Sequence, residues 1–148
     1  MKLIVWQKGI ELFELIWAVV FIENKIDFKL RSQLADAAQS VSANISEGYG
    51  RRSLNEYIQF LYYALGSMAE TMTRSIGLKQ TKQISEKRFR DVDALHYEVE
   101  NRLLRLIDKL EHKRGDEEWI DRIAEDPEEY ATTPSLQHSK TPVLRSHA

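Results

Sequence analysis

An apolar seam between residues 54 and 79 limits the fold of this chain more than any other feature. Its members recur three and four positions apart, which places them on one face of an α-helix. They are Ile58, Leu61, Leu65, Met68, Met72 and Ile76. Gly66 lies within the same segment and costs about 1 kcal/mol relative to alanine, so it predicts a close crossing with a neighbouring helix. A long helix with one apolar face predicts a helical bundle.

Three further segments carry the same helical spacing. Residues 5–22 have a wide apolar surface that predicts contact on two sides, and residues 29–47 combine a seam with many small side chains. The connections are short, and no stretch alternates apolar and polar residues as a half-buried strand does. We therefore predict an all-α, antiparallel, up-and-down four-helix bundle in residues 1–114, with helices at 5–22, 29–47, 54–79 and 86–114.

A sharp turn is predicted between the second and third helices, within residues 40–53. Ser53 and Glu56 have the S-x-x-E spacing of a capping box, in which side chains satisfy the free N–H groups of a helix start. Gly48 and Gly50 predict backbone with positive φ, which a helix end and a tight reversal often need.

Two polar residues precede this turn on one helical face. Asn44 and Glu47 are three positions apart, and we interpret them as a buried polar clamp rather than a catalytic pair. The Glu47 carboxylate needs hydrogen-bond donors, for which Arg51 and Arg52 are the candidates. The predicted turn clamp consists of Asn44, Glu47, Gly48 and Ser53.

No motif in the sequence predicts a reaction. Asp93-x-x-His96 is the one near match to the Glu-x-x-His motifs of di-iron bundles, which need two such motifs, so we interpret His96 as structural or solvated. The chain has no cysteine and therefore no thiolate zinc site or disulfide. It also lacks a nucleophile elbow, a phosphate loop and a dinucleotide fingerprint. We expect no enzyme activity, catalytic residue, metal, cofactor or small-molecule substrate.

Charge divides the chain at about residue 114. Residues 1–114 carry 18 Lys and Arg against 15 Asp and Glu, whereas residues 115–148 carry 3 against 8. We expect residues 115–148 to be an acidic, largely disordered tail with one apolar patch at Trp119. The longest apolar run is far shorter than the roughly 20 residues of a membrane span, and no secretory signal precedes it. We expect a soluble, cytoplasmic protein without a membrane partner.

Basic residues gather at three places in the predicted bundle. One group forms a stripe along the fourth helix, another lies at its start, and a third lies in the turn before the third helix. They are Arg51, Arg52, Lys87, Arg88, Arg90, Arg102, Arg105, Lys109 and Lys113. Two interpretations stay open, an ordinary solvated face and a surface that contacts nucleic-acid phosphates.

Aromatic residues are more numerous than one thin bundle core requires. An apolar patch exposed on a soluble protomer usually marks a partner surface, and a second copy of the chain is the simplest partner. The candidate residues for this interface are Trp6, Phe13, Trp17, Tyr62 and Tyr63.

Several motifs carry a family resemblance. The sequences V-W-Q-K-G-I-E-L at 5–12, S-A-N-I-S-E-G at 42–48 and A-L-G-S at 64–67 resemble the four-helix bundle proteins encoded by intervening sequences in bacterial 23S rRNA genes. The resemblance covers about residues 3–113 and implies a homopentamer. The accessory variability protein of diversity-generating retroelements is similar to this group, and there the pentamer binds nucleic acid and the reverse transcriptase.

The resemblance implies a non-enzymatic, pentameric adaptor. Its partners would be RNA or DNA and an associated nucleic-acid-processing enzyme. The alternative is a protein-only interaction module that uses the acidic tail and the Trp119 patch. The tail also carries negative charge that would compete with nucleic acid for the basic stripe.

Overall fold

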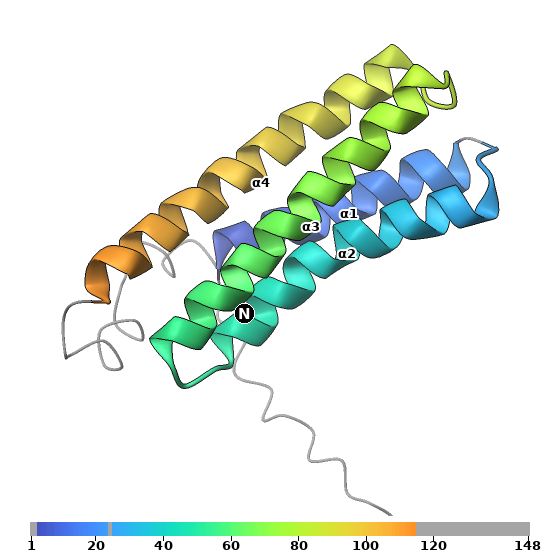
Figure 1. Cartoon of the computed structure of the whole chain (residues 1–148). Helices are drawn as coiled ribbons and strands as arrows, with labels where there is room; N and C mark the ends of the chain where they lie inside the picture. The colour runs from blue at the N-terminus through green and yellow to red at the C-terminus, as the bar shows by residue number, and fades with distance from the viewer. Residues whose placement is uncertain (1–2, 24, 115–148) are drawn as a thin grey trace, which may run out of the picture.

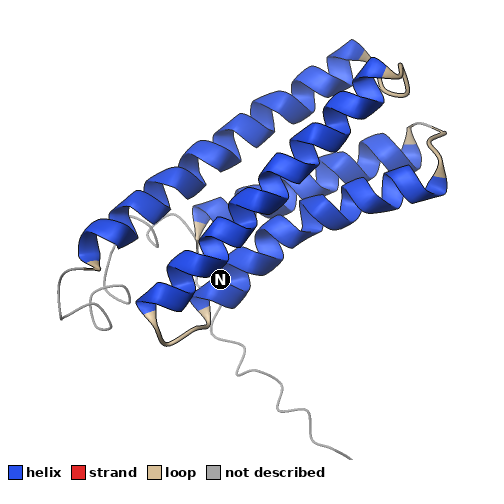
Figure 2. Ribbon diagram, viewed as in Figure 1, coloured by secondary structure: helices blue, strands red, loops and turns tan. Residues whose placement is uncertain are grey.

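Four long helices make up the part of the chain that the structure describes (Figure 1). The structure, a computed structural model, describes residues 3–23 and 25–114. The elements are α1 (Ile4–Trp17), a π-helical turn η1 (Ala18–Ile22) that continues α1, α2 (Phe28–Tyr49), α3 (Leu54–Gln80) and α4 (Glu86–Lys113). Within the described ranges there is no strand (Figure 2), which confirms the all-α prediction. The predictions for the acidic tail and Trp119 lie outside the described residues.

Each helix packs against the two helices beside it. The contacts run α1 to α2, α2 to α3, α3 to α4 and α4 back to α1, with the most extensive contact between α2 and α3. Consecutive helices run in opposite directions because their connections are short (Figure 1). The predicted up-and-down bundle is thus confirmed. Among the described helices, none combines the length and apolar character needed to cross a membrane.

Side-chain caps set three of the helix starts. Asp27 accepts hydrogen bonds from two backbone N–H groups in the first turn of α2. The Ser53 hydroxyl accepts from the Glu56 N–H at 3.5 Å, and the Ser85 hydroxyl accepts from the Arg88 N–H at 3.2 Å. The cap predicted at Ser53 is therefore present, and each cap satisfies a donor that lacks a partner within its helix.

The glycines do not act as the sequence predicted. No described glycine has a positive φ, and Gly50 has a φ of −77°. Gly66 is exposed, and a Cβ at that position would meet nothing within 4 Å, so the predicted close crossing at Gly66 is wrong. Close approaches occur instead at Gly48, described below, and at Gly9, where a Cβ would lie 3.4 Å from Ser42 Cβ.

The buried face of α3 is rotated from the predicted seam. Leu61 and Met68 are buried as expected, but Ile76 is 41% exposed. Thr71 and Ser75 are buried in its place, and each hydroxyl donates to the carbonyl four residues earlier at 2.8 Å. Because these hydroxyls already have acceptors, burying them costs little, and their small size lets a neighbouring helix approach.

Candidate functional site

The basic stripe of α4 lies beside the first half of α1. Arg102 Nη2 lies 3.0 Å from Glu98 Oε1, and Lys8 Nζ of α1 lies 3.9 Å from Glu98 Oε2. Arg105 lies on the same face of α4, is exposed, and forms no ion pair with any described residue. Lys8 is therefore a member of this surface that sequence reasoning missed. The available signal was bundle closure, which places the first helix beside the last.

The basic stripe of α4 continues to the end of the bundle that contains the α2–α3 turn. Lys109 follows Arg105 on the same face of α4. At the turn, Arg51 Nη2 lies 2.5 Å from Glu47 Oε1, and its guanidinium lies 4.7 Å from the centre of the Phe60 ring. The structure therefore brings six of the nine predicted residues into one half of the bundle (Figure 1). They are Arg51, Arg52, Arg102, Arg105, Lys109 and Lys113.

The other three predicted basic residues lie at the opposite end, in the first turns of α4. Lys87 Nζ is 3.1 Å from Asp91 Oδ2, and Arg88 pairs with both Glu23 and Asp91. The hydrogen bond to Glu23 raises the pKa of Arg88, and Lys87 followed by Arg88 lowers the pKa of Asp91. These carboxylates offset much of the charge. Arg88 is about 25 Å along the helix from Arg105, so the nine residues form two surfaces.

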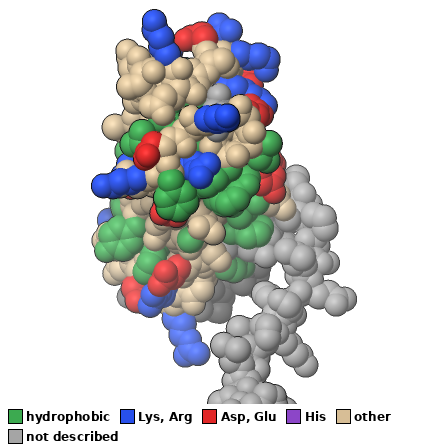
Figure 3. All heavy atoms as spheres, turned by 90° about the vertical axis from the view of Figure 1, so that its right-hand side faces the viewer, with side chains coloured by type: hydrophobic (Ala, Val, Ile, Leu, Met, Phe, Trp, Pro, Cys, Tyr) green, Lys and Arg blue, Asp and Glu red, His purple; other side chains and the backbone are tan. Residues whose placement is uncertain are grey.

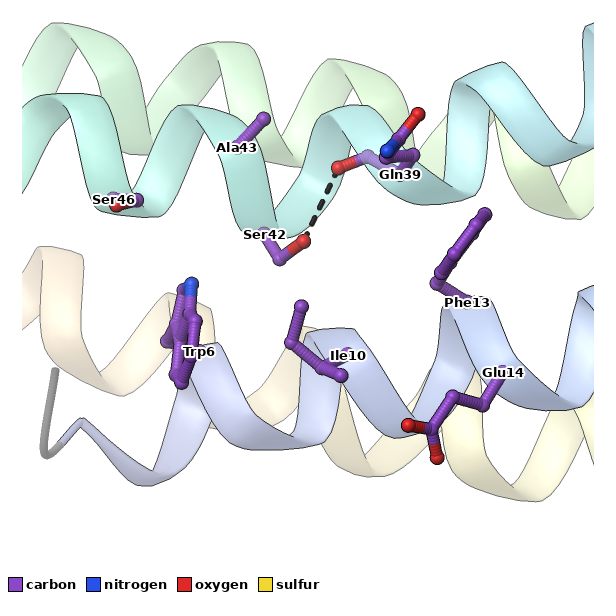
Figure 4. A pocket seen from close by; sticks show the side chains of 8 residues that line it. All are labelled: Trp6, Ile10, Phe13, Glu14, Gln39, Ser42, Ala43 and Ser46. Carbon is purple, nitrogen blue, oxygen red and sulfur yellow. Dashed lines mark hydrogen bonds between the residues drawn. The ribbon is translucent and has the colours of Figure 1, made fainter.

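An apolar groove with a volume of about 410 Å³ lies between α1 and α2. Figure 4 shows Trp6, Ile10 and Phe13 extending from α1 towards the small side chains of α2. The α2 wall is formed by Gln39, Ser42, Ala43 and Ser46. The small α2 side chains leave the groove open because they do not cover the rings opposite them. Trp6 and Phe13, two predicted interface residues, thus lie half-buried along one edge of the bundle.

The remaining predicted interface residues are also partly exposed. Trp17 is 45% exposed and stacks on Phe21 with ring centres 4.2 Å apart. Tyr62 and Tyr63 on α3 are 45% and 51% exposed. The Tyr62 hydroxyl donates to Glu111 Oε1 of α4 at 2.8 Å, and this bond raises the pKa of Tyr62. The five residues therefore divide between the α1–α2 edge and the outer surface of α3.

The predicted turn clamp is only partly correct. Glu47 is exposed and pairs with Arg51, so the expectation of a buried Asn44–Glu47 clamp is wrong. The Asn44 side-chain amide donates to the Ser40 carbonyl at 2.8 Å and lies 3.5 Å from the Ser67 hydroxyl of α3. The two residues act separately because Glu47 reaches towards the solvent-facing turn, whereas Asn44 faces the neighbouring helix.

Gly48 serves the turn through its lack of a side chain, and the expected positive φ is wrong. It is buried inside α2, where a Cβ would lie 2.8 Å from Phe60 Cβ and 2.9 Å from Tyr57 Cδ2. The Tyr57 carbonyl oxygen would be 3.2 Å away. The last turn of α2 therefore packs directly against the first turns of α3, which fixes the position of the turn that carries Arg51.

His96 is a structural residue of the α3–α4 contact. It is 5% exposed, and its Nε2 lies 2.8 Å from the carbonyl oxygen of Met68, to which it donates. Asp93, its partner in the only near match to a metal motif, is exposed. In the part of the chain that the structure describes, no three His, Asp or Glu side chains come together as metal ligands.

Comparisons with known proteins place this chain in a family. A family model described as 23S rRNA-intervening sequence protein matches residues 1–105. A crystal structure of a protein with unknown function from the S23 ribosomal protein family of Bacteroides thetaiotaomicron VPI-5482 has a similar fold, with a TM-score of 0.63 and 23% identity. That likeness covers 70% of this chain and 98% of the other. No curated protein matches the chain.

The matched region holds α1, α2, α3 and most of α4. It also contains the groove and the first part of the basic stripe of α4. At 23% identity the structural likeness shows the fold alone, and it agrees with the four-helix arrangement described above. The family model spans more than half of the chain and all but the last turns of the bundle, and on that ground the chain belongs to the 23S rRNA-intervening sequence protein family.

Proposed function

We propose that this protein is a non-enzymatic, homo-oligomeric adaptor that binds structured nucleic acid, or a nucleic-acid-processing enzyme, along a basic row. The basic row is defined as Lys8, Arg102, Arg105, Lys109 and Lys113. The observation that carries the proposal is the position of Arg105 on the exposed face of α4, beside α1 and without a compensating carboxylate among the described residues. The family name refers to 23S rRNA, which makes RNA the first partner to test.

Self-association supports this function for an electrostatic reason. One bundle presents few unpaired cations, whereas several aligned copies multiply the number of phosphates that can be contacted. The α1–α2 groove and the outer surface of α3 are two different apolar surfaces on each protomer. Contacts between unlike surfaces join copies head to tail, and they close into rings when the rotation allows. A ring of five is the number that the family resemblance implies.

Charge reversal tests the basic row directly. Replacing Arg105 and Lys109 together with glutamate is expected to weaken binding of a blunt-ended RNA hairpin by about tenfold or more, because two phosphate contacts become repulsive. Fluorescence anisotropy over a range of salt concentrations measures this loss, and wild-type affinity should fall steeply as salt rises. The matched control is glutamate at Lys87 and Arg90, which changes the net charge equally at the other end. Equal losses in both variants would mean that overall charge, rather than the row, governs binding.

A single substitution tests the groove as an interface between copies. Ala43 is exposed on the α2 wall of the groove, so glutamate there is compatible with the folded protomer but places a charge against the apolar surface of a second copy. We expect Ala43→Glu to dissociate the oligomer towards the 17.3 kDa protomer, as measured by light scattering. Ala94→Glu, at an exposed alanine of α4, should leave the assembly intact. A wild-type mass equal to one protomer would rule out the assembly.

A further inference from the structure

An arginine without a carboxylate partner lies between two phenyl rings where α1 meets α2. The Arg31 guanidinium is 5.0 Å from the centre of the Phe21 ring and 5.4 Å from that of Phe28. Its Nε is buried and has no hydrogen-bond partner among the described residues. The nearby carboxylates are used elsewhere, since Asp27 caps α2 and Glu23 pairs with Arg88. The buried Nε cannot reach a ligand, so the groups of Arg31 that stay available are its two Nη, which pair with no carboxylate of the described residues.

Large apolar side chains are exposed around this arginine. Phe28 is 68% exposed, Ile22 is 73% exposed, and Trp17 is 45% exposed while it stacks on Phe21. Figure 3, which views the bundle from the right-hand side of Figure 1, shows hydrophobic side chains gathered in a patch with both basic and acidic side chains around it. A flat ring with one exposed face beside a guanidinium offers a stacking surface, and the cation strengthens stacking on it.

Two lysines place further positive charge beside the exposed ring. Lys25 and Lys29 are exposed, flank Phe28 in sequence, and form no ion pair in residues 3–23 and 25–114. The ring and the cations together match what single-stranded nucleic acid requires, a surface for its bases and charge for its backbone. A purely apolar partner would offer no negative charge to these three cations.

We propose that the end of the bundle formed by Phe28, Arg31, Lys25 and Lys29 binds unpaired nucleotides. A base stacks on the exposed face of the Phe28 ring, and the phosphates on either side contact Arg31 and the lysines. The inference rests on the proposed function, because it gives the structured nucleic acid a second contact. The site lies towards the start of α4, because the nearby Glu23 pairs with Arg88, and Arg88 is about 25 Å along the helix from Arg105. One RNA could then bind at two places, with its stem on the basic row and its single-stranded extension at the Phe28 site.

The test compares two fluorescent RNAs on the full-length protein by anisotropy. One is a blunt-ended hairpin, and the other is the same hairpin with an unpaired extension of about ten nucleotides, within the length that stacking proteins occupy. We expect the extension to tighten binding. Phe28→Ala should remove that gain, about tenfold, and leave affinity for the blunt hairpin unchanged. Phe28→Tyr keeps a ring and should keep the gain.

Tyr97 supplies the matched control. It is also 68% exposed and lies on α4, so Tyr97→Ala removes an equally exposed ring from another surface and should not change either affinity. If the blunt hairpin binds and the extension adds nothing, or Phe28→Ala weakens both RNAs equally, this inference fails while the proposed function stands. If neither RNA binds, both fail. If Phe28→Ala lowers the oligomer mass, or an acidic peptide competes and the extension does not, the patch contacts protein and the inference is overturned.

Discussion

Replacing His96 with alanine is expected to lower the free energy of unfolding by about 2–4 kcal/mol. The variant loses a buried ring at the α3–α4 contact and leaves a cavity, because the helices can close it only in part. It also loses the hydrogen bond from Nε2 to the Met68 carbonyl, which joins residues 28 positions apart in the chain. Chemical denaturation followed by circular dichroism measures the change.

Two companion variants separate the packing of His96 from a metal site. His96→Leu fills most of the same volume without a polar atom and should recover more than half of the lost stability. Asp93→Ala alters the exposed partner of the near-match motif and should change stability by less than about 0.5 kcal/mol. If Asp93→Ala were as damaging as His96→Ala, or if Fe²⁺ raised the melting temperature of the wild type alone, the structural role would be wrong.

Alanine at Gly48 and alanine at Gly66 are expected to change stability in opposite directions. Both positions lie inside helices, so both variants gain roughly 0.5–1 kcal/mol because alanine loses less backbone entropy on folding. At Gly66 the new Cβ meets nothing, and the gain should appear in full. At Gly48 it would lie 2.8 Å from Phe60 Cβ, a distance that real Cβ atoms essentially never show, so the backbone of α2 or α3 has to move.

The steric cost at Gly48 follows from comparing the two variants. Overpacking of this kind costs about 1–3 kcal/mol, which makes Gly48→Ala less stable than Gly66→Ala by that amount. Denaturation midpoints measured under the same conditions give the difference directly. Equal stabilities would mean that α2 and α3 do not pack as closely at the turn as described. A stable Gly66→Ala protomer with a reduced oligomer mass would instead place Gly66 against a second copy.

The candidate site shows which parts of a surface can be predicted from sequence. The row of Arg102, Arg105 and Lys109 follows from helical spacing alone, because residues three and four apart share a face. The pairing of Arg88 with Glu23 joins residues 65 positions apart and depends on how the helix ends meet. The Nε of Arg31 lacks a hydrogen-bond partner among the described residues, and its surroundings depend on the rings of Phe21 and Phe28, which come from η1 and α2. Neither could be predicted from periodicity.

The sequence by itself determined the helices, their order and the cap at Ser53, since spacing and capping depend on residues close together in the chain. Only the tertiary structure decided which side of α3 is buried, with Thr71 and Ser75 inside and Ile76 outside. It also decided which glycine is needed for packing. These outcomes depend on the shape of the neighbouring helix, against which the bundle packs as closely as its side chains allow.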